Sequence, residues 1–147
     1  MIKSIDHIGI AVKSLEQAVP LYERAFGLRC SAIETVAGQN VRTAFFPVGG
    51  VRIELLEATS PDSPIARFIE RRGEGVHHVA LQSNAVDDDI NTAVTAGCMH
   101  LDQVGVTGAG GSQVAFLHPR GLCGVLVELC GNHMPDSPPS GQPSAKQ

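Results

Sequence analysis

Short apolar runs and helix-like segments follow one another along this chain, and their order repeats. Residues 6–12, Asp-His-Ile-Gly-Ile-Ala-Val, predict a strand with a histidine near its start. Residues 77–82, His-His-Val-Ala-Leu-Gln, predict a second strand of the same kind. Self-similarity of this sort indicates a duplicated structural unit.

A helix is predicted after each of these strands. The first begins at Ser14, with a glutamine three residues later in the spacing of a capping box, and ends at Gly27. The second begins at Ala85 and ends at Gly97. Glycine tolerates the left-handed conformation that closes many helices. Pro20 is expected to bend the first helix.

The two units also end alike, in a β-branched run with one carboxylate in its middle. Glu54 lies within residues 49–56, and Glu128 lies within residues 123–130. Each run follows a strand and a turn. These strands are predicted at residues 42–46 and 113–117, and the turns at residues 47–50 and 119–124.

This pattern predicts an α+β fold with one domain, residues 1–133. The first module spans about residues 3–58 and the second about residues 76–131, and a helix at about 62–73 connects them. Residues 134–147 are rich in Pro, Ser and Gly, so a disordered tail is predicted there.

Two histidines and two glutamates repeat with the modules. Side chains alternate between the faces of a strand, so only one of His77 and His78 is expected to face a given site, and alignment with His7 selects His78. A lone histidine is more often a structural residue than a ligand. A buried, unpaired carboxylate costs several kcal/mol, however, and Glu54 and Glu128 occur at matching places.

We therefore predict a metal site formed by His7, Glu54, His78 and Glu128. Imidazole and carboxylate donors suit Zn²⁺, Co²⁺, Ni²⁺, Mn²⁺ or Fe²⁺, and four protein ligands leave two positions of an octahedral ion for a bidentate oxygen ligand. The other histidines do not repeat and are interpreted as structural or surface residues: His100, His118 and His133. The four cysteines are expected to be reduced and receive no role: Cys30, Cys98, Cys123 and Cys130.

Charge and hydropathy exclude several classes of partner. The formal net charge is −4 and the chain has no basic stripe, so nucleic acid is not expected to bind. Apolar runs are too short to cross a membrane, and a soluble, cytoplasmic protein is expected. The glycine-rich residues 107–112 fail the P-loop and dinucleotide tests and are expected to form a mobile loop at the mouth of a cavity.

With these residues in hand, the chain resembles the vicinal oxygen chelate superfamily and, within it, the methylmalonyl-CoA epimerase family. The similarity covers about residues 3–130. The matching segments are residues 5–11, 53–57, 62–66, 73–78, 116–119 and 124–129, of which Asp-Ser-Pro-Ile-Ala at 62–66 and Gly-Glu-Gly-Val-His-His at 73–78 point to the epimerases.

The resemblance implies two tandem βαβββ modules in a cupped, partly closed β-sheet, the glyoxalase/bleomycin resistance/dioxygenase fold. It also implies a homodimer, an acyl-CoA substrate, one divalent metal ion (Co²⁺, Mn²⁺, Ni²⁺ or Zn²⁺), and interconversion of (2R)- and (2S)-methylmalonyl-CoA by proton transfer at the α-carbon through an enediolate. Cationic candidates for contacts with CoA are Lys13, Arg67, Arg71, Arg72 and Arg120.

The resemblance makes Glu128 a metal ligand that also serves in proton transfer. A second glutamate used by some bacterial members aligns with Thr43, which has no useful basicity, so we expect Glu54 to serve on the opposite face. Two alternatives stay open: a glyoxalase I-type lyase with the same ligands, and a metal-free small-molecule binding protein.

Overall fold

The computed structural model describes residues 1–101, 108 and 111–131. The strands are β1 (Ile2–Ala11), β2 (Ala32–Val36), β3 (Val41–Val48), β4 (Val51–Ala58), β5 (Gly75–Ser83), β6 (His100–Leu101), β7 (Val114–Leu117) and β8 (Val127–Cys130). The helices are α1 (Leu15–Phe26), α2 (Pro64–Arg72) and α3 (Val86–Thr95), with short 3-10 turns η1 (Ala37–Gln39) and η3 (Pro119–Gly121). The predicted tail and half of the predicted loop at 107–112 lie outside the described residues.

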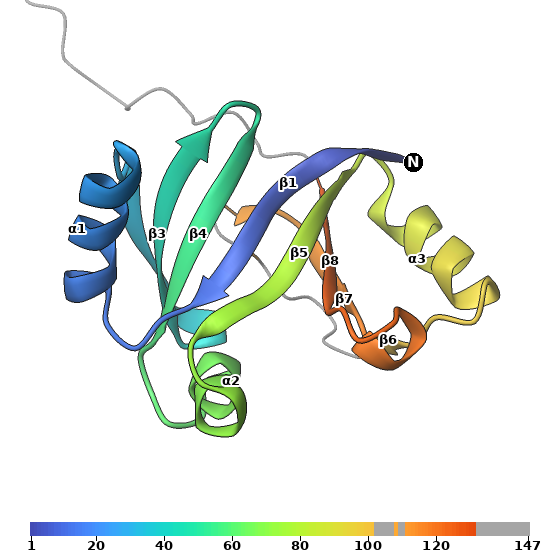
Figure 1. Cartoon of the computed structure of the whole chain (residues 1–147). Coiled ribbons are helices and arrows are strands. Elements are labelled where there is room, and N and C mark those ends of the chain that lie inside the picture. The colour runs from blue at the N-terminus through green and yellow to red at the C-terminus, as the bar shows by residue number, and fades with distance from the viewer. Residues whose placement is uncertain (102–107, 109–110, 132–147) are drawn as a thin grey trace, which may run out of the picture.

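All eight strands belong to one open, mixed sheet in the order β2-β3-β4-β1-β5-β8-β7-β6. In each half, the first strand of a module pairs in parallel with the last, β1 with β4 and β5 with β8. The halves join through the antiparallel β1–β5 pair. The sheet is strongly twisted, with β3 and β4 on one side of this pair and β7 and β8 on the other (Figure 1). The predicted α+β fold of two tandem modules is confirmed.

The ends of α1 follow the predicted signals, whereas α3 ends at Thr95 with Ala96 as its C-cap, one residue before the predicted Gly97. The Ser14 hydroxyl accepts a hydrogen bond from the Gln17 backbone N–H, and Gly27 closes α1 with φ of 64°. The helix continues through Pro20. Ser63 caps α2 in the same way, by accepting from the Ile65 N–H.

The predicted turn at residues 47–50 is shorter than expected, because Pro47 still belongs to β3 and pairs with Arg52. Pairing between β2 and β3 ends at Phe45, so Pro47 lies beyond the part of β3 that has neighbours on both sides. A residue without an N–H is tolerated there. The turn itself consists of Gly49 and Gly50.

The helices α1 and α3 cover the outer face of the two halves of the sheet, whereas the inner face surrounds a cavity. Val12, Leu15, Phe46 and Leu55 form a core cluster with α1, and a second cluster joins α3 to β7 and β8. The helix α2 packs against β4, β5 and β1. The outer face thus carries apolar side chains, whereas the inner face carries both the polar side chains of the cavity and apolar ones, of which Leu56 belongs to a cluster with Ile65 of α2.

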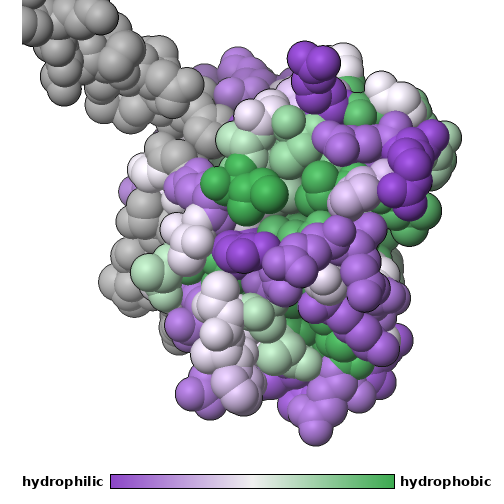
Figure 2. Space-filling model, turned by 90° about the vertical axis from the view of Figure 1, so that its left-hand side faces the viewer, coloured by the Kyte–Doolittle hydropathy of each residue, from purple (hydrophilic) through white to green (hydrophobic). Residues whose placement is uncertain are grey.

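The side of the molecule that carries α1 presents apolar residues in separate patches among polar ones (Figure 2). Leu21 and Phe26 of α1 are among its exposed apolar side chains. Among the described helices, none has the length and apolar character needed to cross a bilayer.

Candidate metal centre

Four neighbouring strands at the middle of the sheet carry the four predicted metal ligands. His7 is on β1, Glu54 on β4, His78 on β5 and Glu128 on β8. In each module the glutamate pairs with the residue two positions after the histidine: Glu54 with Gly9, and Glu128 with Ala80. Residues two apart share a face of a strand, so both histidines and both glutamates face the same side.

The donor atoms of these four buried side chains converge. The Nε2 atoms of His7 and His78 are 2.9 Å apart. Glu128 Oε2 lies 3.1 Å from His78 Nε2 and 3.8 Å from His7 Nε2. Glu54 Oε2 lies 3.5 Å from His7 Nε2. The sequence-predicted site residues are therefore brought together by the fold.

Asp6 and His77 also reach the site, although strand alternation predicts that they face away. The β1–β5 register shifts at both positions: Ile5 pairs with Leu81 but His7 with Ala80, and Gly9 pairs with His78 but Ile10 with Val76. Such shifts are typical of β-bulges, which re-aim side chains beside active sites. The expectation that only one of His77 and His78 can face the site is wrong for this reason.

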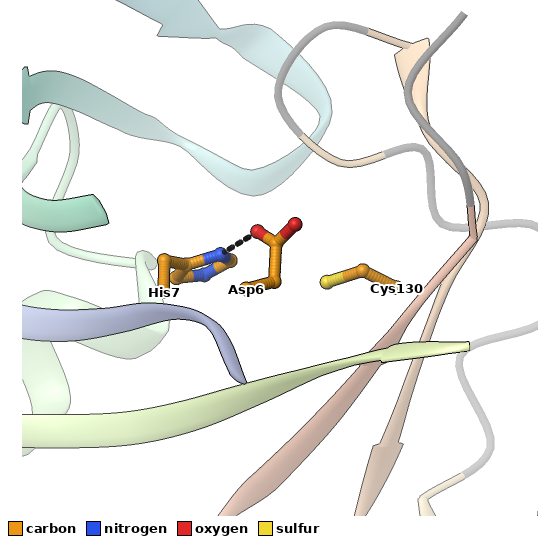
Figure 3. Close-up of side chains that lie close together, drawn as sticks. All are labelled: Asp6, His7 and Cys130. Atoms are coloured by element: carbon orange, nitrogen blue, oxygen red, sulfur yellow. Dashed lines mark hydrogen bonds and ion pairs between the residues drawn. The ribbon is translucent and has the colours of Figure 1, made fainter. Parts of the chain in front are cut away.

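Asp6 contacts His7 Nδ1, the outer nitrogen of the ring, which faces away from the converging donors, and Arg52 holds Asp6 in place. The His7 Nδ1 is 2.7 Å from Asp6 Oδ1, and an Arg52 Nη2 donates to the same oxygen at 2.6 Å. Arg52 also lies 3.3 Å from Glu54 Oε1 and stacks over the Phe45 ring. Figure 3 shows the Asp6 carboxylate pointing at the His7 ring, with Cys130 directed toward them from the other half of the sheet.

Different partners hold the second histidine and its glutamate. His78 Nδ1 lies 2.9 Å from His77 Nδ1. The Cys130 thiol donates to Glu128 Oε1 at 3.0 Å and is 3% exposed. In the first module, the residue two positions after the glutamate is Leu56, whose side chain has no donor.

Burial and neighbouring charges shift the pKa values of these groups. Burial alone would lower the pKa of His7, but the hydrogen bond to Asp6 and the charges of Glu54 and Glu128 raise it above its ordinary value. Burial raises the pKa of Glu54 against the opposing charges of His7 and Arg52. The pKa of Glu128 is lowered because hydrogen bonding and charge from His78, with the charge of His7, outweigh burial.

Two further shifts identify neutral groups. Burial and the nearby His78 lower the pKa of His77 to about 4. Burial and the charge of Glu128 raise the pKa of the Cys130 thiol. Cys130 is therefore a protonated hydrogen-bond donor and not a thiolate nucleophile.

The site opens into a cavity of about 400 Å³. Its wall includes Thr43, which is 2% exposed, and the apolar side chains of Leu56, Phe116 and Leu126. The described wall contains Arg52 but not the five cations predicted to contact CoA. Gly108 and Ser112, from the predicted loop, lie at the cavity as expected.

The donor set fits one divalent metal ion. Nitrogen and oxygen donors about 2.1 Å from one ion and at right angles to each other are about 3 Å apart, close to the two shortest separations found here. His7, His78 and Glu128 each offer an atom within 4.8 Å of the others, and Glu54 approaches from the His7 side. Three carboxylates and one guanidinium line the described wall, so a dication would balance the charge when the imidazoles are neutral.

Sequence reasoning missed four residues of the site: Asp6, Arg52, His77 and Cys130. Asp6 and His77 directly precede His7 and His78, and Arg52 and Cys130 lie two positions from Glu54 and Glu128. The spacing of Arg52 and Cys130 places them on the ligand face, which was the available signal. Of the non-repeating histidines, His118 is structural, because its Nδ1 accepts from the Arg120 N–H.

Comparisons with known proteins agree with this fold. Residues 6–116 match the Glyoxalase/Bleomycin resistance protein/Dioxygenase superfamily. The chain is 41% identical over 126 residues to the uncharacterized protein YqjC of Bacillus subtilis, covering 86% of this chain and 90% of that protein. It is 33% identical over 131 residues to an ethylmalonyl-CoA/methylmalonyl-CoA epimerase of Cereibacter sphaeroides, covering 88% and 98%.

A solved structure extends the comparison. A variant of Streptomyces coelicolor methylmalonyl-CoA epimerase in complex with 2-nitronate-propionyl-CoA superposes with a TM-score of 0.86 and 34% identity, covering 91% of this chain and 100% of that one. Together with the repeated modules and the matched family model, these similarities show that the chain belongs to the glyoxalase/bleomycin resistance protein/dioxygenase superfamily.

Proposed function

We propose that this chain is a metal-dependent epimerase that interconverts the 2R and 2S forms of methylmalonyl-CoA. The observation that carries the proposal is the convergence of two imidazoles and two carboxylates at one cavity. Its support in the comparisons is the similarity to epimerases named for methylmalonyl-CoA, and for ethylmalonyl-CoA in one case. A larger 2-alkyl group is therefore a further candidate substrate.

His7, His78, Glu54 and Glu128 would hold the metal ion. When bound, a divalent ion would supply Lewis-acid stabilisation of the negative charge that develops when the substrate loses its α-proton. The hydrogen bonds from His7 Nδ1 to Asp6 and from the Cys130 thiol to Glu128 would orient these ligands before substrate enters.

Epimerisation requires one group to remove the α-proton and another to return a proton to the opposite face. Glu54 and Glu128 are on β4 and β8, which lie on either side of the central β1–β5 pair. We assign the two proton-transfer roles to these glutamates. Thr43 lines the cavity, but its hydroxyl cannot act as the second base at neutral pH.

The remaining wall controls access of water. Leu56, Phe116 and Leu126 present apolar surface around the donors, which lowers the local dielectric and strengthens each charge interaction. The acyl and thioester end of the substrate would occupy this cavity. The phosphates of CoA would remain outside, where cationic side chains of the surface are available.

The decisive experiment follows the α-proton. The protein, loaded in turn with Co²⁺, Mn²⁺, Ni²⁺ and Zn²⁺, is incubated with methylmalonyl-CoA in D₂O, and loss of the α-proton signal is measured by NMR. A chelator-treated sample and His7→Ala should lose the exchange. His100→Ala is the matched control, because His100 is on β6 and is not part of the described cavity wall.

A parallel assay with the hemithioacetal of methylglyoxal and glutathione distinguishes the alternative lyase. Metal-dependent exchange without lactoylglutathione formation is the expected result. Lactoylglutathione formation without α-proton exchange would replace the proposal by a glyoxalase I-type activity. If removal of the metal left α-proton exchange unchanged, the assigned role of the metal would be contradicted.

A further inference from the structure

The metal ligands repeat between the modules, but the residues behind them do not. Asp6 and His77 occupy equivalent places, each at a register shift directly before a ligand histidine. Both bulges turn the preceding side chain toward the outer nitrogen of that histidine. One module uses a carboxylate for this contact, whereas the other uses a second imidazole.

The carboxylate of Asp6 is fixed from two sides. Its Oδ1 lies 2.7 Å from His7 Nδ1 and accepts from Arg52 at 2.6 Å. Arg52 is itself held by the ion pair with Glu54 and by the Phe45 ring. Because the side chain of Asp6 is 10% exposed, water competes weakly for these bonds.

These contacts determine which nitrogen of His7 carries the proton. An ionised carboxylate only accepts hydrogen bonds, so His7 Nδ1 must donate to Asp6. The lone pair of a neutral His7 is then on Nε2, the atom that points at His78 and Glu54. In the pair formed by His77 and His78, either imidazole can donate through Nδ1. Without metal, His78 Nε2 is the donor toward His7 Nε2, so His78 Nδ1 accepts from His77.

We propose that Asp6, anchored by Arg52, is the positioning residue that locks His7 in the metal-binding tautomer, whereas His78 adopts its metal-binding tautomer only when metal binds. This inference rests on the metal site proposed above. It makes the two halves of a repeated ligand set unequal: the first module is organised in advance, and the second changes the direction of the His77–His78 hydrogen bond on binding.

Imidazole ¹⁵N NMR of the metal-free protein tests the lock directly. At a pH above the raised pKa of His7, where the ring is neutral, wild-type His7, assigned by comparison with His7→Gln, is expected in the Nδ1–H form. Asp6→Ala should shift it toward the Nε2–H form. The matched control is the ion pair between Arg42 and Glu57, which joins β3 to β4 outside the described cavity wall. Glu57→Gln should leave the His7 signals unchanged.

Metal affinity provides the second measurement, by calorimetry with Co²⁺ or Zn²⁺. Asp6→Ala and Asp6→Asn are expected to weaken binding by about 10- to 100-fold, as is common when a residue behind a metal ligand is lost. Arg52→Gln should act in the same direction and Arg52→Lys less. Glu57→Gln and Arg42→Gln should stay within about twofold of wild type, and circular dichroism verifies that each variant is folded.

The outcomes separate this inference from the proposed metal site. Wild-type metal binding that requires His7 but is unchanged in folded Asp6→Ala would overturn the role of Asp6 alone. No binding of any tested metal by the wild type would overturn both. A His7 signal in the Nε2–H form in the metal-free wild type would also contradict the lock.

Discussion

Gly9 lies directly opposite His78 in the antiparallel β1–β5 pair, and the imidazole of His78 occupies the space that a side chain at position 9 would need. A Cβ atom there would be 2.6 Å from Nδ1 and 2.8 Å from Nε2 of the ring. The equivalent position in the second module, Ala80, lies opposite His7 and does carry a Cβ. The restriction to glycine therefore applies to one half of the site.

Gly9→Ala is expected to displace the His78 ring and to weaken metal binding by at least tenfold, because a ligand outside its productive geometry contributes little. The overpacked site should also lower the free energy of unfolding by about 1–3 kcal/mol. Calorimetric metal titration and urea unfolding measure the two effects. Gly50→Ala is the control, since an added Cβ there meets nothing within 4 Å. Equal metal affinities for the two variants would contradict this account.

Glu54→Gln is expected to lower the rate of α-proton exchange by about 10²- to 10⁴-fold, the usual contribution of a general acid or base. An amide oxygen still coordinates a metal ion, so most metal affinity should remain. Measurement of α-proton exchange and metal titration on the same sample separate the loss of proton transfer from a loss of metal binding. Glu57→Gln, on the same strand, controls for loss of a carboxylate. Normal turnover would remove Glu54 from the mechanism.

The Cys130 thiol is expected to orient Glu128. Cys130→Val keeps an apolar side chain of similar size but removes the donor, which leaves Glu128 Oε1 with one bond fewer and should cost about 1–3 kcal/mol of stability. Metal affinity should fall with it. Cys130→Ser restores a donor and should recover affinity relative to Cys130→Val. Failure of serine to recover any affinity, with both variants folded, would count against the hydrogen bond.

Metal removal should destabilise the protein, because the four donors come together only in the folded chain. At a free metal concentration 100 times the Kd, binding contributes about 2.7 kcal/mol. Thermal unfolding with and without a chelator measures this difference as a change in Tm. The His7→Ala variant should show a much smaller change. An identical metal-dependent rise in Tm in that variant would place the bound metal elsewhere.

Phe46→Ala tests the core cluster between α1 and the sheet. The side chain is fully buried with Leu15 and Leu55 under α1, so its removal should cost about 3–5 kcal/mol in urea unfolding. Phe26→Ala, at an exposed position of α1, should cost far less. Metal affinity of folded Phe46→Ala should stay close to wild type, because this cluster lies on the helix-covered face of the sheet.

The four converging side chains that we propose as metal ligands could be identified from the sequence because period-2 alternation and the internal repeat both act locally along the chain. Alignment of the two repeats pairs His7 with His78 and Glu54 with Glu128, and it requires no knowledge of the strand order. Asp6 and His77 could not be found in this way. Their orientation depends on register shifts between β1 and β5, and a shift is a property of two paired strands rather than of either sequence alone.

Other differences between the predicted and the observed structure also depend on how strands pair and pack. Pro47 was assigned to the turn at 47–50 but belongs to β3, where the short overlap of β2 with β3 makes a backbone donor unnecessary. The hydrogen bond from Cys130 to Glu128 needs only a two-residue spacing, yet nothing in the sequence separates a buried donor from ordinary apolar filling at that position. Helix ends at Ser14 and Gly27 were predictable because capping involves only neighbouring residues.

The central β1–β5 contact has a consequence for the ancestry of the site. Each module contributes one imidazole and one carboxylate, and two equivalent strands run antiparallel where the modules join. That is the contact that two identical chains can make across a twofold axis. A half-length chain, dimerised through this strand, would therefore bring together a complete set of four donors, and fusion of the two copies would have allowed Asp6 and His77 to diverge.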